Sequence, residues 1–251
     1  MMLHQDASRF AWLPGDDRQY DLVVTLDDAT SAIYSGFIVE EEGTASSFRA
    51  LAEVIDKHGL FCELYTDRGS HYFHTPKAGE AVSKTVQTQL GRALAQLGIR
   101  HIAAYSPEAR GRSERAFRTL QDRLPKEFAL AGITTIAAAN RWLAASYWPA
   151  HNTAFAAAPA EAGSAFVRDR TGCVRDILCI QEERRVGNDN TVKWHGVTLQ
   201  IPPSPLRAHF VRAAVRVHEY PDGHLAIFHG PHRLADYDPD GNPCNQAKLA
   251  A

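Results

Sequence analysis

The sequence has little of several features that define common classes of protein. Its 251 residues include four cysteines, Cys62, Cys173, Cys179 and Cys244, and none of them forms a CxxC pair. This scarcity argues against a zinc site and against a disulfide framework, and it fits a reducing compartment. Apolar runs stay short of the roughly 18 residues of a membrane helix, and the first residues do not form a signal peptide. A cytoplasmic protein without a membrane partner is therefore expected.

An excess of charge is also missing. The net charge is -2, so contact with nucleic acid would have to come from local clusters of basic residues. Glycine-rich phosphate loops are absent, which argues against use of a nucleoside triphosphate. Histidines are dispersed along the chain; His71, His74 and His101 offer a rival zinc site, but their spacing is a weak signal.

The hydrophobic patterns that are present predict an α/β fold. Tyr20–Leu26 and Ile33–Val39 have the β-branched content of a strand hairpin, and Ser46–Lys57 has a helical period that ends at His58-Gly59. With the later segments, among them a second helix expected over Thr85–Leu97, the order is strand, strand, strand, helix, strand, helix, strand, helix. That order predicts a mixed sheet with helices on its faces.

Changes in composition predict the domain organisation. Residues 1–150 are expected to form the α/β domain, in which a last helix, Ile136–Tyr147, is stopped by Pro149. Residues 151–170 are expected to be a linker and residues 171–238 a small all-β barrel, because short strands alternate there with Gly, Pro and Asn turns. Residues 239–251 are expected to be a disordered tail.

One helix carries an acid in a basic neighbourhood. From Arg112 onward a helical stripe of apolar residues is formed by Phe117, Leu120, Leu124 and Phe128. Glu114 lies in the first turn, near the edge of that stripe, while Pro125 lies inside the helix and is expected to kink it. Taken alone, Glu114 is better explained as a surface residue in a salt bridge.

Two further acids can converge with Glu114. Asp6 lies on the first predicted strand and Asp67 follows the strand Phe61–Tyr65. Sites in open sheets gather beyond strand ends, and three carboxylates that meet need a hard cation such as Mg²⁺ or Mn²⁺. Simpler roles stay open: Asp67 as a turn residue, and Asp6 as an exposed acid. The pair Asp27-Asp28 is a second candidate for the first acid.

Specific motifs add a family resemblance. The stretches LYTDRGSHYF, DDATSAIYSGFI and AYSPEARGRSERAFRTLQDRLPKEFALAGI resemble the integrase core of insertion-sequence transposases of the ISNCY type, within the retroviral-integrase superfamily. Asp6-Ala7-Ser8 is similar to the first-acid strand of that family, and RVGNDNTVKWHGVTLQIPP is similar to its C-terminal β-barrel module.

The resemblance implies an RNase H-like catalytic core. Asp6, Asp67 and Glu114 would be its DDE triad, binding two Mg²⁺ (or Mn²⁺) ions for cleavage and transfer of DNA strands at transposon ends. The implied partners are transposon-end and target DNA and further copies of the chain, with the protein at the bacterial nucleoid. Between Arg100 and Glu127, seven Lys and Arg stand against four Asp and Glu. The arginines expected to contact DNA phosphates are Arg68, Arg110, Arg112, Arg115, Arg118 and Arg123.

Two alternatives remain beside this interpretation. The family is expected to carry a helix-turn-helix region ahead of the core, and no such region precedes Met1 in this sequence. One alternative is therefore a catalytically inactive truncated or domesticated protein that binds DNA or assists assembly. The other is a nuclease that stops at hydrolysis.

Overall fold

The structure is a computed structural model that describes residues 1–76, 81–83, 85–105, 111–161 and 163–244. The chain divides into two compact units, Met1–Ile177 and Leu178–Ala251. Among the described residues, no helix is both long and apolar enough to cross a membrane.

The first unit is built on a five-stranded sheet in the order β3-β2-β1-β4-β5. Its strands are β1 (Met2–Phe10), β2 (Tyr20–Asp27), β3 (Ile33–Val39), β4 (Glu63–Thr66) and β5 (Arg100–Ala103). β2 runs antiparallel to both β1 and β3, whereas β1, β4 and β5 run parallel. This mixed sheet and its helices confirm the predicted RNase H-like α/β fold class.

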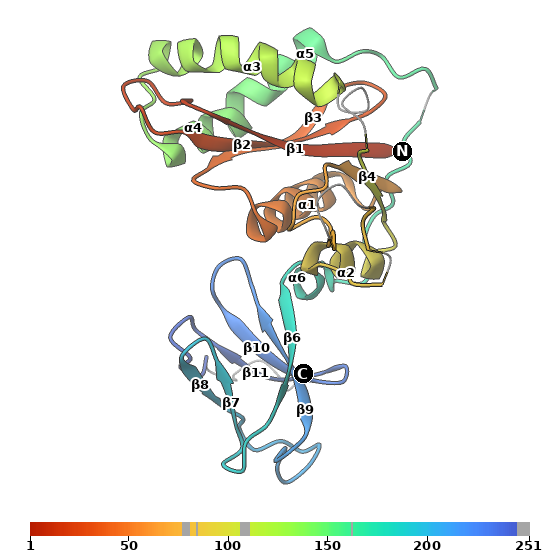
Figure 1. The fold of residues 1–251 in the computed structure, drawn as a ribbon, viewed down its shortest axis with the longest axis vertical. Helices are drawn as coiled ribbons and strands as arrows, with labels where there is room; N and C mark the ends of the chain where they lie inside the picture. Colours follow the sequence, from red (N-terminus) through yellow and green to blue (C-terminus); the bar gives the residue numbers. More distant parts are fainter. Residues whose placement is uncertain (77–80, 84, 106–110, 162, 245–251) are drawn as a thin grey trace. The chain divides into compact units, whose positions relative to one another are not determined.

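Helices cover both faces of the sheet (Figure 1). On one face lie α1 (Thr44–His58) and α2 (Gln89–Gln96); on the other lie α3 (Gly111–Leu130), α4 (Ile136–Trp142) and α5 (Trp148–Phe155). Because side chains alternate along a strand, Val23 of β2 packs with the α1 face, while its neighbours Leu22 and Val24 pack with the α3 face. All eight residues of β2 are consequently buried.

α3 is held on the sheet by the apolar stripe that the sequence predicted. Phe117, Leu120, Leu124 and Phe128 are all buried in the core that also contains β2 residues. Pro125 lies inside α3, and the helix continues past it to Leu130. The first turn of α3 is thereby fixed above β1.

Two predicted helix boundaries were wrong. The helix expected over Thr85–Leu97 begins only at Gln89, because the Thr88 side chain accepts the backbone N–H of Gly91 and caps the first turn. Pro149 does not stop the helix before it. A π-helical turn (η2, Leu143–Tyr147), in which Trp148 donates its N–H to Leu143, leads directly into α5, and Pro149 follows that turn at the start of α5.

The α4–α5 segment also protects the free edge of β3. Asn152 bonds both the N–H and the C=O of Ile33, each at 2.8 Å, and Asn140 does the same for Ile38 at 2.7 and 2.8 Å. Trp148 donates its indole N–H to the carbonyl of Gly36. A Cβ at Gly36 would lie 2.5 Å from Cζ2 of Trp148, so only glycine leaves room for this ring. Backbone N–H and C=O groups of β3 that could pair with another strand are thus already hydrogen-bonded.

The second unit is the small all-β region that was expected. A four-stranded sheet has the order β11-β10-β9-β6, and β7 (Thr191–Trp194) pairs with β8 (Val197–Gln200). The four strands are β6 (Ile180–Arg185), β9 (Ala214–Glu219), β10 (Leu225–His229) and β11 (His232–Tyr237). Side chains from both sheets, among them Trp194, Leu199 and Ile227, share one buried core.

The unit boundary and the expected domain ranges differ at two points. α5 extends to Phe155, inside the range expected as linker, and α6 (Val174–Ile177) belongs to the first unit. At the other end, Cys244 donates its N–H to Asp236 at 2.8 Å, so the described part of the expected tail folds back on β11. Residues 245–251 lie outside the described residues.

Candidate active site

β1 and β4 bring two of the predicted acids together. In their parallel pairing, His4 of β1 lies opposite Tyr65 of β4. Two residues further along, this register places Asp6 level with Asp67, and both side chains line one cavity of about 10 Å³. A cavity of this size holds about one water molecule.

Asp6 is buried, with 8% of the residue exposed, and hydrogen bonds satisfy its carboxylate oxygens. Oδ2 accepts a hydrogen bond from the Ser113 hydroxyl at 2.8 Å, and Oδ1 accepts the Ala7 N–H at 3.0 Å. A buried carboxylate is costly unless hydrogen bonds replace its hydration, and these two do so. The bond from Ser113 also ties the first turn of α3 to β1.

Asp67 is held by the turn that follows β4. Its Oδ1 accepts the Gly69 N–H at 2.8 Å, the pattern of an aspartate that caps its own turn. This is the simpler role that the sequence allowed for Asp67. The turn also keeps the side chain at the cavity that Asp6 lines, so the two roles are compatible.

Glu114 is not brought into this cavity. It is exposed, and Ser113, which is 3% exposed, lines the cavity in its place. Ser113 precedes Phe117 by four residues and therefore belongs to the buried stripe, whereas Glu114 lies about 100° around the helix. Glu114 shares its side of α3 with Gln121, seven residues later, which donates to Ser8 of β1 at 2.9 Å. Glu114 thus lies at the border of the α3–β1 contact.

The donor atoms fit a hard divalent cation in part. Asp6 and Asp67 offer carboxylate oxygens beside a cavity large enough for one small ion, which suits Mg²⁺ or Mn²⁺. Within the described ranges, however, no group of three or more His, Cys, Asp or Glu side chains is placed to hold a metal ion. Glu114 would supply the third carboxylate only after its side chain moved to a different conformation that reaches the cavity.

A tyrosine missed by the sequence reasoning holds the loop after Asp67. The buried Tyr72 hydroxyl donates to Glu42 at 2.9 Å and accepts from the Gln5 amide at 3.1 Å. Burial and the Glu42 carboxylate raise the pKa of Tyr72 well above its usual value, so the hydroxyl stays a donor. Since Gln5 adjoins Asp6, this network links the segments that carry both acids. A loop tyrosine offers no signal of this role in the sequence.

Local contacts occupy the alternative acids Asp27 and Asp28. Asp27 accepts the N–H and the hydroxyl of Thr30 at 2.9 and 2.7 Å, closing the β2–β3 turn. Asp28 lies 2.8 Å from the ring of His4. In the antiparallel register, Asp27 is opposite Leu3, three residues before Asp6. The pair therefore lies outside the cavity that Asp6 and Asp67 share.

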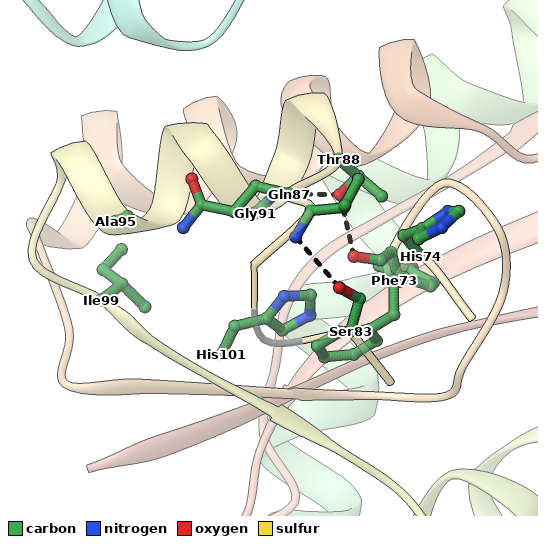
Figure 2. Close-up of a pocket in the computed structure, with 11 residues that line it drawn as sticks. Phe73, His74, Ser83, Gln87, Thr88, Gly91, Ala95, Ile99 and His101 are labelled. Carbon is green, nitrogen blue, oxygen red and sulfur yellow. Dashed lines mark hydrogen bonds between the residues drawn. The ribbon is translucent and has the colours of Figure 1, made fainter. Parts of the chain in front are cut away.

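Histidines line a neighbouring cavity of about 210 Å³ between α2 and the loop after β4 (Figure 2). His101 lies 2.9 Å from the Thr66 hydroxyl and stacks on Phe73. Burial, with a smaller effect of His71, lowers the pKa of His101 to about 4, so its ring is neutral at neutral pH. His74 lines the same cavity.

The expected DNA-contacting arginines are distributed around α3. Arg115 and Arg118 are exposed on adjacent turns, while Arg123 is exposed on another side and stacks on Phe155 at 5.1 Å. Arg68 stacks on Tyr105 at 5.2 Å. Arg110 and the side chain of Arg112 lie outside the described residues.

Sequence comparison confirms the predicted resemblance to insertion-sequence transposases. The chain is 32% identical, over 242 residues, to “Putative transposase y4bF” of Sinorhizobium fredii (strain NBRC 101917 / NGR234), covering 93% of this chain and 52% of that protein. It is 30% identical, over 142 residues, to the transposase for insertion sequence IS1202 of Streptococcus pneumoniae, covering 57% of this chain and 30% of that protein. The chain thus spans about half the length, or less, of these relatives. No protein-family model matches it.

Retroviral integrases are among the solved structures that resemble this chain. The catalytic core domain of HTLV-2 integrase, solved with magnesium, has a TM-score of 0.42 at 16% identity, covering 57% of this chain and 83% of that chain. A chain of the simian T-cell lymphotropic virus intasome has a TM-score of 0.46 at 16% identity, covering 90% of this chain and 71% of that chain.

Proposed function

We propose that the chain is the catalytic core and C-terminal module of a DDE-type transposase, which cleaves and joins DNA at transposon ends. The observation that carries the proposal is the parallel register of β1 and β4, which places Asp6 and Asp67 at one cavity. The similarity to two transposases supports the same activity. DNA and further copies of the chain are the proposed partners, with the nucleoid as the proposed place of action.

Asp6, Asp67 and Glu114 would hold Mg²⁺ or Mn²⁺, which supplies activation of an attacking oxygen and stabilisation of the leaving oxygen in phosphodiester displacement. The protein's own residues have separate tasks. Ser113 orients Asp6, the Gly69 turn orients Asp67, and Tyr72 holds the loop after Asp67. The exposed arginines of α3 would hold DNA phosphates on either side of the scissile bond.

Calorimetric titration with Mn²⁺ tests the site. Asp6→Asn and Asp67→Asn are expected to weaken binding at least tenfold, or about 1.4 kcal/mol, because each removes a charged ligand. Asp27→Asn and Asp28→Asn are the matched controls, since they neutralise acids of the same sheet outside the cavity. Unchanged Mn²⁺ affinity in the first two variants would show that the acids are not ligands.

The exposed position of Glu114 favours the inactive alternative and needs its own test. In a plasmid-nicking assay with Mn²⁺, Glu114→Gln is expected to abolish nicking while part of the metal affinity of the Asp6–Asp67 pair remains. If Glu114→Gln nicks like the unaltered chain, the third acid is assigned wrongly. Absence of nicking in the unaltered chain would favour the inactive alternative.

A strand-transfer assay with pre-cut DNA from the flanks of the gene separates a transposase from a hydrolytic nuclease.

A further inference from the structure

A groove of about 380 Å³ lies between α3 and the α4–η2–α5 segment, away from the Asp6–Asp67 cavity. Its volume is in the range of pockets that bind small ligands. Arg123 and Glu127 of α3 form one wall. The opposite wall consists of residues of the second segment: Trp142, Ser146, Tyr147, Ala150, His151, Ala154 and Phe155.

Four of these side chains form a row of rings along the groove. Successive ring centroids lie 5.3 Å apart from Trp142 to Tyr147, 5.6 Å from Tyr147 to His151 and 4.8 Å from His151 to Phe155. The π-helical turn η2 inserts an extra residue ahead of Tyr147, and such turns are frequent at functional sites. Trp142 is partly exposed and Phe155 is 49% exposed, so both ends of the row are accessible to a planar ligand.

Two buried polar atoms in the groove have no hydrogen-bond partner among the described residues: the hydroxyl oxygen of Tyr147 and Nδ1 of His151. Tyr147 is only 8% exposed. Buried polar atoms normally have partners, because an unsatisfied one has lost its bonds to water without replacement. This pair therefore indicates a ligand that brings hydrogen-bonding groups to the groove.

The charges around the groove favour a neutral ligand. Arg123 and Glu127 carry opposite charges on the same wall. Burial, together with Arg123, lowers the pKa of His151, which keeps its ring neutral at neutral pH. An isolated phosphate would therefore meet little net positive charge.

We propose that this groove binds an unpaired nucleobase, stacked on the aromatic row and hydrogen-bonded to Tyr147 and His151. A nucleobase is planar, neutral and edged with both donors and acceptors, and stacking on protein rings stabilises a bound base of any sequence. α3 also carries the exposed Arg115 and Arg118, which could hold the backbone of the same strand. The inference rests on the proposed binding of DNA, and it adds a contact outside the carboxylate site.

The test uses 2-aminopurine, a fluorescent adenine analogue, within a short single-stranded oligonucleotide, in EDTA so that no cation contributes. The full chain is expected to quench its fluorescence and to bind at least tenfold more tightly than it binds the matching duplex. Tyr147→Phe keeps the ring and removes the hydroxyl, and it should weaken binding about fivefold. Tyr34→Phe, the same change outside the groove, is the control.

A second pair of variants covers the case in which Tyr147→Phe does not fold. Ala154→Trp should fill the groove from an exposed position and abolish quenching, whereas Ala144→Trp, at an exposed alanine outside the groove lining, should not. Equal binding of duplex and single strand, or unaltered binding by Ala154→Trp, would overturn the proposal.

These readouts are independent of the carboxylate site. Asp6→Asn is expected to bind the oligonucleotide normally while losing Mn²⁺ affinity. If the unaltered chain bound Mn²⁺ and nicked DNA but did not bind the base, the groove alone would be refuted. The reverse pattern would refute the proposed metal site alone.

Discussion

Ser113 and Glu114 show how one step along a helix separates two roles. Ser113 lies on the buried stripe of α3 and bonds Asp6, whereas Glu114, the next residue, is exposed. A carboxylate at the position of Ser113 would be buried beside Asp6, where two negative charges repel each other without a cation. Glu114 lies at the border of the contact between α3 and β1, so its carboxylate avoids this repulsion when no metal is bound.

His101 carries a prediction for the pH dependence of stability. Its folded pKa of about 4 lies below the usual value of 6.5, so the unfolded chain binds this proton more readily. The free energy of unfolding should therefore fall as the pH drops from about 6.5 to 4, by roughly 3 kcal/mol at most from this residue. Urea denaturation of His101→Gln across this range should show a weaker pH dependence.

His74→Gln is the control for that measurement, because it changes an exposed histidine of the same cavity. Lowered pKa values of His58 and His151, also caused by burial, add to the dependence in the same direction. A residual slope is therefore expected in His101→Gln. An unchanged slope would mean that His101 is not protected from protonation in the folded chain.

At the scale of elements, α3 joins three surfaces. Its apolar stripe packs on the sheet, its first turn contacts Asp6, and its exposed arginines point away from the core. Asp6 is hydrogen-bonded to the helix that carries the arginines, so the Asp6 carboxylate and the arginines move together. A substrate bound by the arginines would be positioned relative to Asp6 by the helix itself.

Salt dependence tests the arginines of α3. Arg115→Ala and Arg118→Ala should each weaken binding of duplex DNA without regard to sequence, and each should reduce the slope of log affinity against log salt by about 1. The physical reason is that each arginine removed leaves about one fewer counterion released. Arg18→Ala removes the same charge from a loop residue paired with Asp16, and it should leave the slope unchanged. Equal slopes in all three variants would exclude α3 from the DNA interface.

At the scale of the whole molecule, two units with separate cores share one chain. The first unit is stabilised around the five-stranded sheet and the second around the core of its two small sheets. Separate cores predict two transitions on heating, because the loss of one core need not expose the other.

A matched pair of asparagines tests the separation by calorimetry. Asn152 bridges the N–H and C=O of Ile33 in the first unit, and Asn190 bonds the N–H of Phe210 and the C=O of Ile201 in the second. Asn152→Ala should lower one midpoint and Asn190→Ala the other, each by the cost of unsatisfied backbone groups, about 1–3 kcal/mol. If either variant lowered both midpoints equally, the two units would not unfold independently.

Local patterns carried much of the prediction. Period-two and helical patterns identified the hairpin, the apolar stripe of α3 and the β-rich second unit, because each is set by which side chains avoid water. The predicted stop at Pro149 failed because the π-helical turn before it shifts the backbone hydrogen-bond pattern, and the helical segment continues past the proline. Asn140 and Asn152 gave no signal, since their partners on β3 lie more than 100 residues away in the chain.

The sequence by itself determined the class of fold, the two candidate aspartates and the resemblance to transposases, all of which depend on short motifs and local periodicity. The tertiary structure alone decided which groups meet: the β1–β4 register brings Asp6 beside Asp67, the rotation of α3 gives Ser113 rather than Glu114 to the cavity, and Tyr72 reaches Gln5. The physical reason is that strand register and helix rotation are set by packing between distant segments, which no local pattern contains.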